Sequence, residues 1–357
     1  MKMVRQRNTG IDFLRILAAF MVILLHILGQ GGLLDALPSH SIRYKAAWSL
    51  EIMCYCAVNC FGLISGFVGW NSRSSWSGIL RTWLQVLFYT VGASVILHFF
   101  IPDAVPLKAI FKSFFPVLTT KYWYYTAYFC LSFFAPAMNH LIRTFPKQQL
   151  RLLCISGAIL LSVIPTGINR DLFYSQYGYS IIWLMLLYMV GGYLSRYPVS
   201  KASSRKYICF YFISVAVTCL HKLYPDLFGP LKQMPFLQYT SPTILACAVS
   251  LLIFLSHCDF PGIIRSGIRF LAPLCFGTYL LHAQGIVFFN FMENRFGSLG
   301  QHHTILMLLD VFVIAVLWFL MGVSIDYIRN KLFNRLNVPG LCKKLDLLQE
   351  NLLSDTK

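Results

Sequence analysis

The feature that most restricts the fold of this chain is a long apolar run near its start, residues 11–30, which reads IDFLRILAAFMVILLHILGQ. A helix that crosses a bilayer needs about 20 predominantly apolar residues, so this run is long enough. It nevertheless contains Arg15 and His26. An ionisable side chain inside a membrane span is costly and marks a candidate functional site. We therefore expect a transmembrane helix that carries functional groups.

The spacing of these two residues adds to the expectation. At 3.6 residues per turn, the interval from Arg15 to His26 is about three turns, so both side chains lie on nearly one face, about 16 Å apart along the axis. Taken singly, each has a structural explanation. Arg15 could pair with Asp12 or reach the headgroups, and His26 could be a neutral, hydrogen-bonded interior histidine. Their shared face favours a functional interpretation.

Composition indicates a polytopic membrane protein. Of the 357 residues, 57% are hydrophobic and 12% are charged, whereas soluble domains carry about 25% charged residues. We predict an all-α bundle of ten transmembrane helices within residues 1–330, followed by a short amphipathic cytoplasmic tail, 331–357. The predicted spans are 11–30, 47–70, 79–101, 122–142, 151–168, 179–196, 206–222, 241–258, 267–291 and 304–328.

The charge pattern predicts an orientation. The net charge is +17, but the basic residues lie mainly between apolar spans, and no nucleic-acid motif is present, so the expected partner is the lipid bilayer and no nucleic acid. Most Lys and Arg residues lie on the side that holds the N-terminus, which predicts that both termini are cytoplasmic. The first span is too long for a cleavable signal peptide. Eleven cysteines lack metal-ligand spacing, so we expect no metal and interpret them as packing residues.

The order of Arg15 and His26 along the span predicts a reaction that combines phosphate recognition with proton transfer. The planar fork of arginine suits phosphate, and histidine transfers protons near neutral pH. An acyl-CoA that enters from the cytoplasm would place phosphates toward Arg15 and its thioester toward His26. The histidine could then act as general base on an acceptor hydroxyl, or accept the acyl group itself. The sequence leaves both routes open.

The order of motifs resembles the type-3 membrane acyltransferase family, which includes O-acetyltransferases of bacterial surface polysaccharides and O-antigens. Arg15 followed by His26 is similar to its R-x10-H signature, and residues 61–67 read F-x-x-x-S-G-F, similar to its second-helix motif. Further similar features are Arg81 at the start of the third span, Trp123 with Pro136-Ala137-Met138-Asn139 in the fourth, and Phe276-Gly277-Thr278-Tyr279-Leu280-Leu281-His282 in the ninth.

The resemblance implies a ten-helix acyltransferase in the cytoplasmic (inner) membrane, with acyl-CoA as co-substrate and no bound cofactor. The acceptor would be a glycan or glycolipid. It implies that His26 is catalytic and that Arg15 binds or orients the donor. Arg73 and Arg81, near the cytoplasmic face, are further candidate donor-binding residues. Second-tier candidates are Ser65, Glu51, Trp123, Tyr279 and His282. One departure is Asn59, which stands where the family often has an acidic residue.

The leading hypothesis is thus transfer of an acyl group, expected to be acetyl, from CoA to a hydroxyl of a cell-surface glycan or its lipid-linked precursor. The alternative is a secondary transporter or flippase that uses Arg15 and His26 for anion binding and proton relay. Such transporters often show two related halves, and no internal repeat is evident here. A third option is a membrane enzyme that acylates lipids or proteins.

Overall fold

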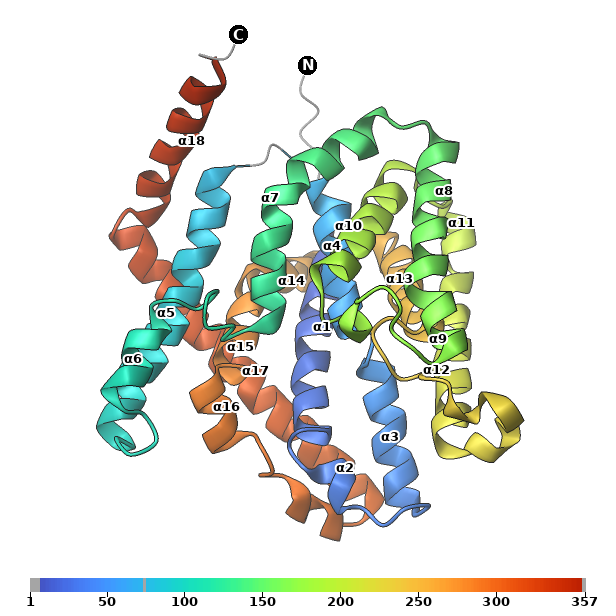
Figure 1. Ribbon diagram of the computed structural model, residues 1–357. Helices are drawn as coiled ribbons and strands as arrows, with labels where there is room; N and C mark the ends of the chain where they lie inside the picture. The colour runs from blue at the N-terminus through green and yellow to red at the C-terminus, as the bar shows by residue number, and fades with distance from the viewer. Residues whose placement is uncertain (1–6, 73–74, 355–357) are drawn as a thin grey trace.

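A computed structural model describes residues 7–72 and 75–354, and helices are its only regular elements in these ranges. Figure 1 shows them as one bundle, in which α1 begins and α18 ends at the same end, here called the N-side; the opposite end is the far side. The longer helices are α1 (Thr9–Leu28), α3 (Ile42–Cys54), α4 (Ala57–Gly69), α5 (Trp76–Phe100), α7 (Trp123–Thr144), α8 (Lys147–Ala158), α10 (Ile181–Arg196), α12 (Lys206–Leu223), α13 (Pro242–Ser256), α14 (Gly262–Leu271), α17 (Thr304–Arg335) and α18 (Val338–Ser354).

Shorter helical segments connect these elements. They are α2 (Leu33–Ala36), α6 (Leu107–Ser113), the π-helix η1 (Ile159–Val163), α9 (Ile164–Ile168), η2 (Gln176–Gly178), α11 (Lys201–Ser204), η3 (Pro225–Gln233), η4 (Ala272–Leu274), α15 (Cys275–His282), α16 (Gly285–Phe291) and η5 (Gly297–Gln301). Of these, α2, α6, α16 and η3 lie toward the far side (Figure 1).

Helix α1 is the centre of the bundle. Its residues are apolar around most of the helix, and such a helix is stable only when other elements surround it. It contacts α3, α4, α13, α14, α15 and α17, and most of its side chains are buried. Asn8 caps its N-terminus by accepting a hydrogen bond from the Ile11 amide at 3.0 Å. The predicted first span is therefore one unbroken helix with protein on nearly every side.

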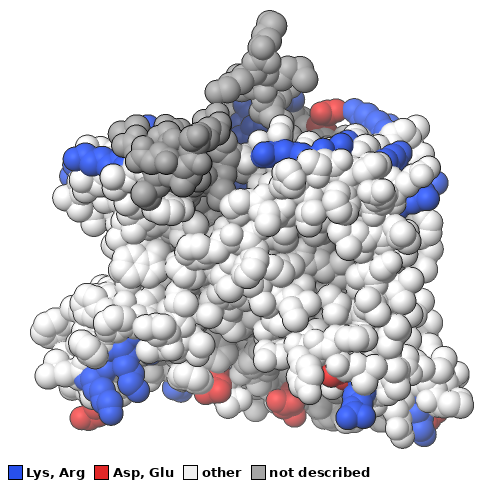
Figure 2. Space-filling view, turned by 45° about the horizontal axis from the view of Figure 1, so that its top comes forward, with Lys and Arg blue, Asp and Glu red and all other residues white. Residues whose placement is uncertain are grey.

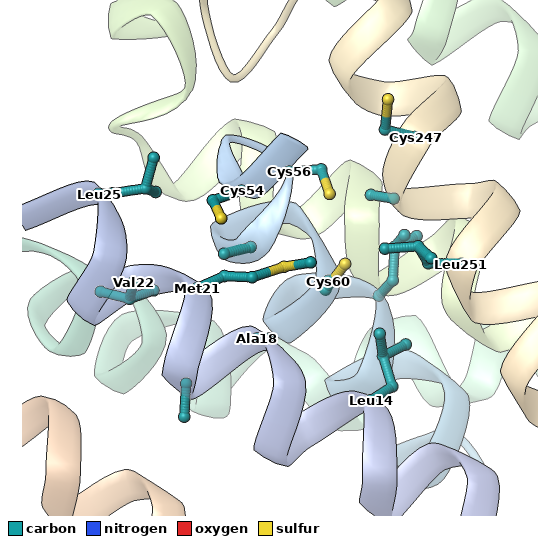
Figure 3. Packing of buried hydrophobic residues seen from close by; sticks show 14 of the residues in the cluster. Leu14, Ala18, Met21, Val22, Leu25, Cys54, Cys56, Cys60, Cys247 and Leu251 are labelled. Carbon is teal, nitrogen blue, oxygen red and sulfur yellow. The ribbon is translucent and has the colours of Figure 1, made fainter. Parts of the chain in front are cut away.

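Sulfur-containing side chains fill the space between α1 and its neighbours. Figure 3 shows Met21 of α1 close to Cys54, Cys56 and Cys60 of the second span, with Cys247 on α13 beyond them. These four cysteines are fully or almost fully buried and are free thiols. Thioether and thiol groups adapt to irregular gaps in a core. The interpretation of these cysteines as packing residues is confirmed.

Glycines bring α4 and α10 into close contact. A Cβ atom on Gly66 would lie 1.9 Å from the carbonyl oxygen of Tyr188, and one on Gly191 would lie 2.0 Å from that of Leu63. Only a residue without a side chain allows two backbones to approach in this way. Gly66 of the F-x-x-x-S-G-F motif therefore serves helix packing.

The helices occupy the ten predicted ranges, but two of the expected spans are broken. The second is divided at Tyr55 and Cys56 into α3 and α4. The ninth consists of α14, η4 and α15, and it turns by 67° into α16. In the described ranges, six helical segments are long and apolar enough to cross a membrane, and a seventh is added if this bent pair counts as one span. The chain is therefore a polytopic membrane protein.

Charged side chains lie at the two ends of the bundle. On the face that Figure 2 shows, Lys, Arg, Asp and Glu form an upper and a lower row, and the wide band between them is uncharged. This distribution matches a protein whose middle faces lipid. The predicted tail contains α18, which contacts α5; Asp346 accepts hydrogen bonds from the Ser75 hydroxyl at 2.8 Å and the Ser77 amide at 3.0 Å.

Candidate active site

Arg15 is held on α1 by a carboxylate one turn earlier. Its Nη1 donates to Asp12 Oδ1 at 3.1 Å, and Arg7 bonds the other oxygen of the same carboxylate. Asp12 is buried, with 4% of its surface exposed. The pairing anticipated for Asp12 and Arg15 is thus present. It uses only one of the five donors of the guanidinium group.

The side chain of Arg15 faces a cavity of about 460 Å³ in the N-side half of the bundle, here called the proximal cavity. Small hydroxyl-bearing residues from the end of α4 and the start of α5 line it, and rings of α7 line the opposite wall. The lining includes Ser65, Ser72, Ser75, Thr82, Tyr128, Ser132, Asn139 and Tyr188. Among the described residues the other donors of this guanidinium have no hydrogen-bond partner, and a guanidinium at the wall of a cavity can bind an anion.

His26 faces a second cavity of about 600 Å³, here called the distal cavity. It lies in the far-side half, between the end of α1 and loops that precede α7, α10 and α13. Its lining includes Glu51, Tyr55, Lys121, Trp123, Tyr179, Tyr239 and Tyr279. The ring atom Nδ1 of His26 is buried and has no hydrogen-bond partner in the part of the chain that the structure describes, which leaves Nε2 as the nitrogen that can act on a ligand in the cavity.

His282 of α15 lies directly behind His26. The two ring centroids are 4.9 Å apart in an edge-to-face arrangement, and His282 is 1% exposed. Its Nδ1 lies 2.6 Å from the carbonyl oxygen of Thr278. A carbonyl oxygen can only accept, so the proton sits on Nδ1 and Nε2 is left as an acceptor. The second-tier candidate His282 is therefore a direct neighbour of His26.

The two cavities meet at a set of aromatic rings. Phe61, Tyr124 and Phe276 line both of them, and they come from α4, α7 and α15. The rings of Phe61 and Tyr124 are 6.2 Å apart, and Tyr279 lies 6.2 Å from Tyr124 and 6.1 Å from Phe276. Arg15 and His26 therefore face neighbouring cavities with a shared aromatic partition, rather than one continuous space.

Some of the other predicted site residues line the proximal or the distal cavity, and others line neither. Ser65 lines the proximal cavity and donates to the Phe61 carbonyl oxygen at 2.8 Å. Glu51, Trp123 and Tyr279 line the distal cavity with His26. Arg81 lies on the exposed surface of α5 and is not among the residues that line either cavity. Arg73 lies outside the described residues. The donor-binding roles of Arg73 and Arg81 remain predictions.

Several lining residues were not predicted. Tyr179 and Tyr239 reach the distal cavity from loops, where no periodicity indicates a direction. The structure also explains why residue 59 is an asparagine and not an acidic residue. Its amide donates to the Tyr239 carbonyl oxygen at 2.7 Å and accepts from Trp183 Nε1 at 2.9 Å. A carboxylate has no proton for that carbonyl, so asparagine suits this site, and its role is to hold the Tyr239 loop.

Inside a helical membrane protein, a half-buried histidine at one internal cavity and an arginine at the next suit either a membrane-embedded enzyme or a transporter. Comparison with protein families gives the particular class: the family described as "Acyltransferase domain" matches residues 8–325. The chain therefore belongs to the acyltransferase 3 family and is an acyltransferase. This finding favours the enzyme hypothesis over the transporter alternative. No curated protein and no solved structure matched the chain.

Proposed function

We propose that the protein transfers an acyl group, expected to be acetyl, from acyl-CoA to a hydroxyl of a cell-surface glycan or its lipid-linked precursor. The observation that carries this proposal is the placement of Arg15 and His26, on one helix, in two adjoining cavities. The N–H groups of the Arg15 guanidinium suit the phosphates of acyl-CoA. In this proposal the narrow pantetheine arm reaches His26 between the rings of the aromatic partition, which must separate to admit it.

The orientation belongs to the same proposal. We place the N-side in the cytoplasm, where acyl-CoA is made, because basic residues predominate there. The far side then faces outward, both termini are cytoplasmic, and ten helical segments cross the inner membrane, with α10 and α13 as short spans. Arg73 and Arg81 would add positive charge near the donor entrance.

The chemical step follows from His26. As a general base, Nε2 takes the proton of the acceptor hydroxyl while the oxygen attacks the thioester carbonyl carbon. The C–S bond breaks, and the thiolate of CoA receives the proton. In the second route, Nε2 attacks the thioester carbonyl carbon, the C–S bond breaks and CoA leaves as its thiolate; the acceptor oxygen then attacks the acyl-imidazole, the N–C bond breaks, and the proton of the hydroxyl passes to the CoA thiolate. Accumulation of acyl-enzyme after mixing with donor alone distinguishes the second route from the first.

Replacement of His26 tests this assignment. We expect His26→Ala to lower acyl transfer by about 100- to 10,000-fold, the usual contribution of a positioned acid–base group, with normal abundance in the membrane. The measurement is transfer of labelled acetyl from acetyl-CoA to cell-surface glycans, read by mass spectrometry. His303→Ala is the matched control, because His303 is exposed on the same side. Activity retained in His26→Ala would remove the proposal.

A further inference from the structure

Glu51 is a buried carboxyl group in the wall of the distal cavity. It lies on α3, is 6% exposed, and its Oε2 atom is buried without a hydrogen-bond partner in the described part of the chain. The other oxygen lies 3.4 Å from where a Cβ on Gly29 would be. Gly29 follows His26 by about one turn of α1, so the carboxyl group is close to the histidine.

An unsatisfied buried carboxyl oxygen is expensive, because the protein forgoes its hydrogen bonds to water without replacing them. Such a group is retained where a ligand completes its hydrogen bonds. Lys121 is the only Lys or Arg among the residues that line this cavity, and no ion pair joins it to Glu51 among the described residues. A carboxyl group accepts hydrogen bonds from hydroxyls, which indicates a hydroxyl-bearing ligand.

Aromatic rings stand beside this carboxyl group. The ring centroids of Trp123 and Tyr179 are 4.5 Å apart, those of Tyr179 and Tyr239 are 5.1 Å apart, and those of Tyr55 and Tyr239 are also 5.1 Å apart. All four rings line the cavity. Tyr55 follows Glu51 by four residues, so the two share one side of the chain where α3 ends. Flat aromatic faces next to a hydroxyl acceptor match a sugar ring, which has apolar C–H faces and polar edges.

We propose that Glu51 and the ring cluster Tyr55, Trp123, Tyr179 and Tyr239 form the binding site for a pyranose unit of the acceptor. This inference rests on the proposed function, and it assigns acceptor recognition to residues other than those that perform the transfer. Glu51 accepts hydrogen bonds from two hydroxyls of the sugar, and a hydroxyl near His26 is the one acylated. Trp123 and the tyrosines pack against the faces of the ring.

Direct binding tests the site separately from catalysis. The probe is a set of methyl pyranosides that differ in one hydroxyl configuration, titrated into purified protein in detergent and followed by saturation-transfer NMR. We expect the wild type to bind at least one of them. Glu51→Gln should raise its Kd about 10-fold and Glu51→Leu about 100-fold, in line with the loss of one and of two hydrogen bonds to the sugar. Binding of CoA should not change.

Two controls separate the possible failures. Glu293→Gln changes the other glutamate of the far side, which does not line the distal cavity, and should bind the pyranoside like wild type. His26→Ala should bind it as well while transferring no acyl group. If the wild type binds the pyranoside but transfers no acyl group, the proposed function is rejected and the sugar site is kept. If Glu51→Gln transfers the acyl group with an unchanged acceptor KM, the sugar site is rejected and the proposed function is kept.

Trp123→Leu supplies a second variant in case the Glu51 variants fail to fold, as judged by their apparent Tm. It should raise the pyranoside Kd at least 10-fold and leave CoA binding unchanged, because stacking on an aromatic ring is lost. The proposal is overturned if no methyl pyranoside binds the wild type. It is equally overturned if folded Glu51 and Trp123 variants bind the pyranoside with the wild-type Kd.

Discussion

At the scale of single residues, Asn59 shows how a departure from a family pattern acquires a physical role. Its side chain is fully buried, and its two polar atoms hold the Tyr239 backbone and the Trp183 indole. Tyr239 lines the distal cavity, so this hydrogen-bonded bridge connects the α4 helix to the wall that we assign to the acceptor.

We expect Asn59→Asp to destabilise the protein by about 1–3 kcal/mol, because it removes the donor and directs a carboxylate oxygen at the Tyr239 carbonyl. The measurement is the apparent Tm of purified protein, together with the KM for the acceptor, which should rise. Asn71→Asp, in an exposed turn, is the control and should change neither. An unaltered Tm for Asn59→Asp would show that this bridge does not hold the loop.

Sequence reasoning could predict Arg15 and His26 but not the partition between their cavities. Their shared face follows from helical periodicity, which needs only one segment. The partition consists of Phe61, Tyr124 and Phe276, from three helices that are distant in sequence. Only tertiary packing brings those rings together. The same reason explains why the sequence could name Glu51 as a second-tier candidate but could not place it in the cavity that His26 lines.

At the scale of elements, the approximate positions of the helices could be predicted because long apolar runs identify them, but the breaks could not. Tyr55 and Cys56 interrupt the second span with residues that favour no particular break. The interruption matters, because it places Glu51 and Tyr55 at the distal cavity. The close crossing of α4 and α10 restricts both helices, since their backbones meet at Gly66 and Gly191.

We predict that Gly66→Ala separates α4 from α10. The new methyl group would lie within 1.9 Å of a backbone oxygen, so a helix must move, at a cost of about 1–3 kcal/mol or more. The apparent Tm should fall and transfer should decrease, because Ser65 and Phe61 line the cavities from the same helix.

Gly92→Ala in α5 is the matched control for that substitution. No atom lies within 4 Å of a Cβ built there, and alanine favours a helix over glycine by up to about 1 kcal/mol. This variant should keep or raise the apparent Tm. If Gly66→Ala behaves like Gly92→Ala, the close crossing of α4 and α10 does not govern the stability of the bundle.

At the scale of the whole molecule, the visible face has two charged ends and an uncharged band between them (Figure 2), and the two cavities lie in different halves of the bundle. This arrangement supports the proposed function. In that proposal, a donor that binds at Arg15 and an acceptor that binds near His26 approach from opposite sides, and the acyl end of the donor passes the rings. The central claim is therefore that acyl transfer occurs across the membrane.

The most direct measurement uses sealed liposomes that contain the purified protein in one orientation. Labelled acetyl-CoA is supplied only on the N-side, and a glycan acceptor only on the far side. We predict labelled acetyl on the acceptor while CoA stays on the side where it was added, and no product with His26→Ala. Product formation only when donor and acceptor share one side of the membrane would contradict this account.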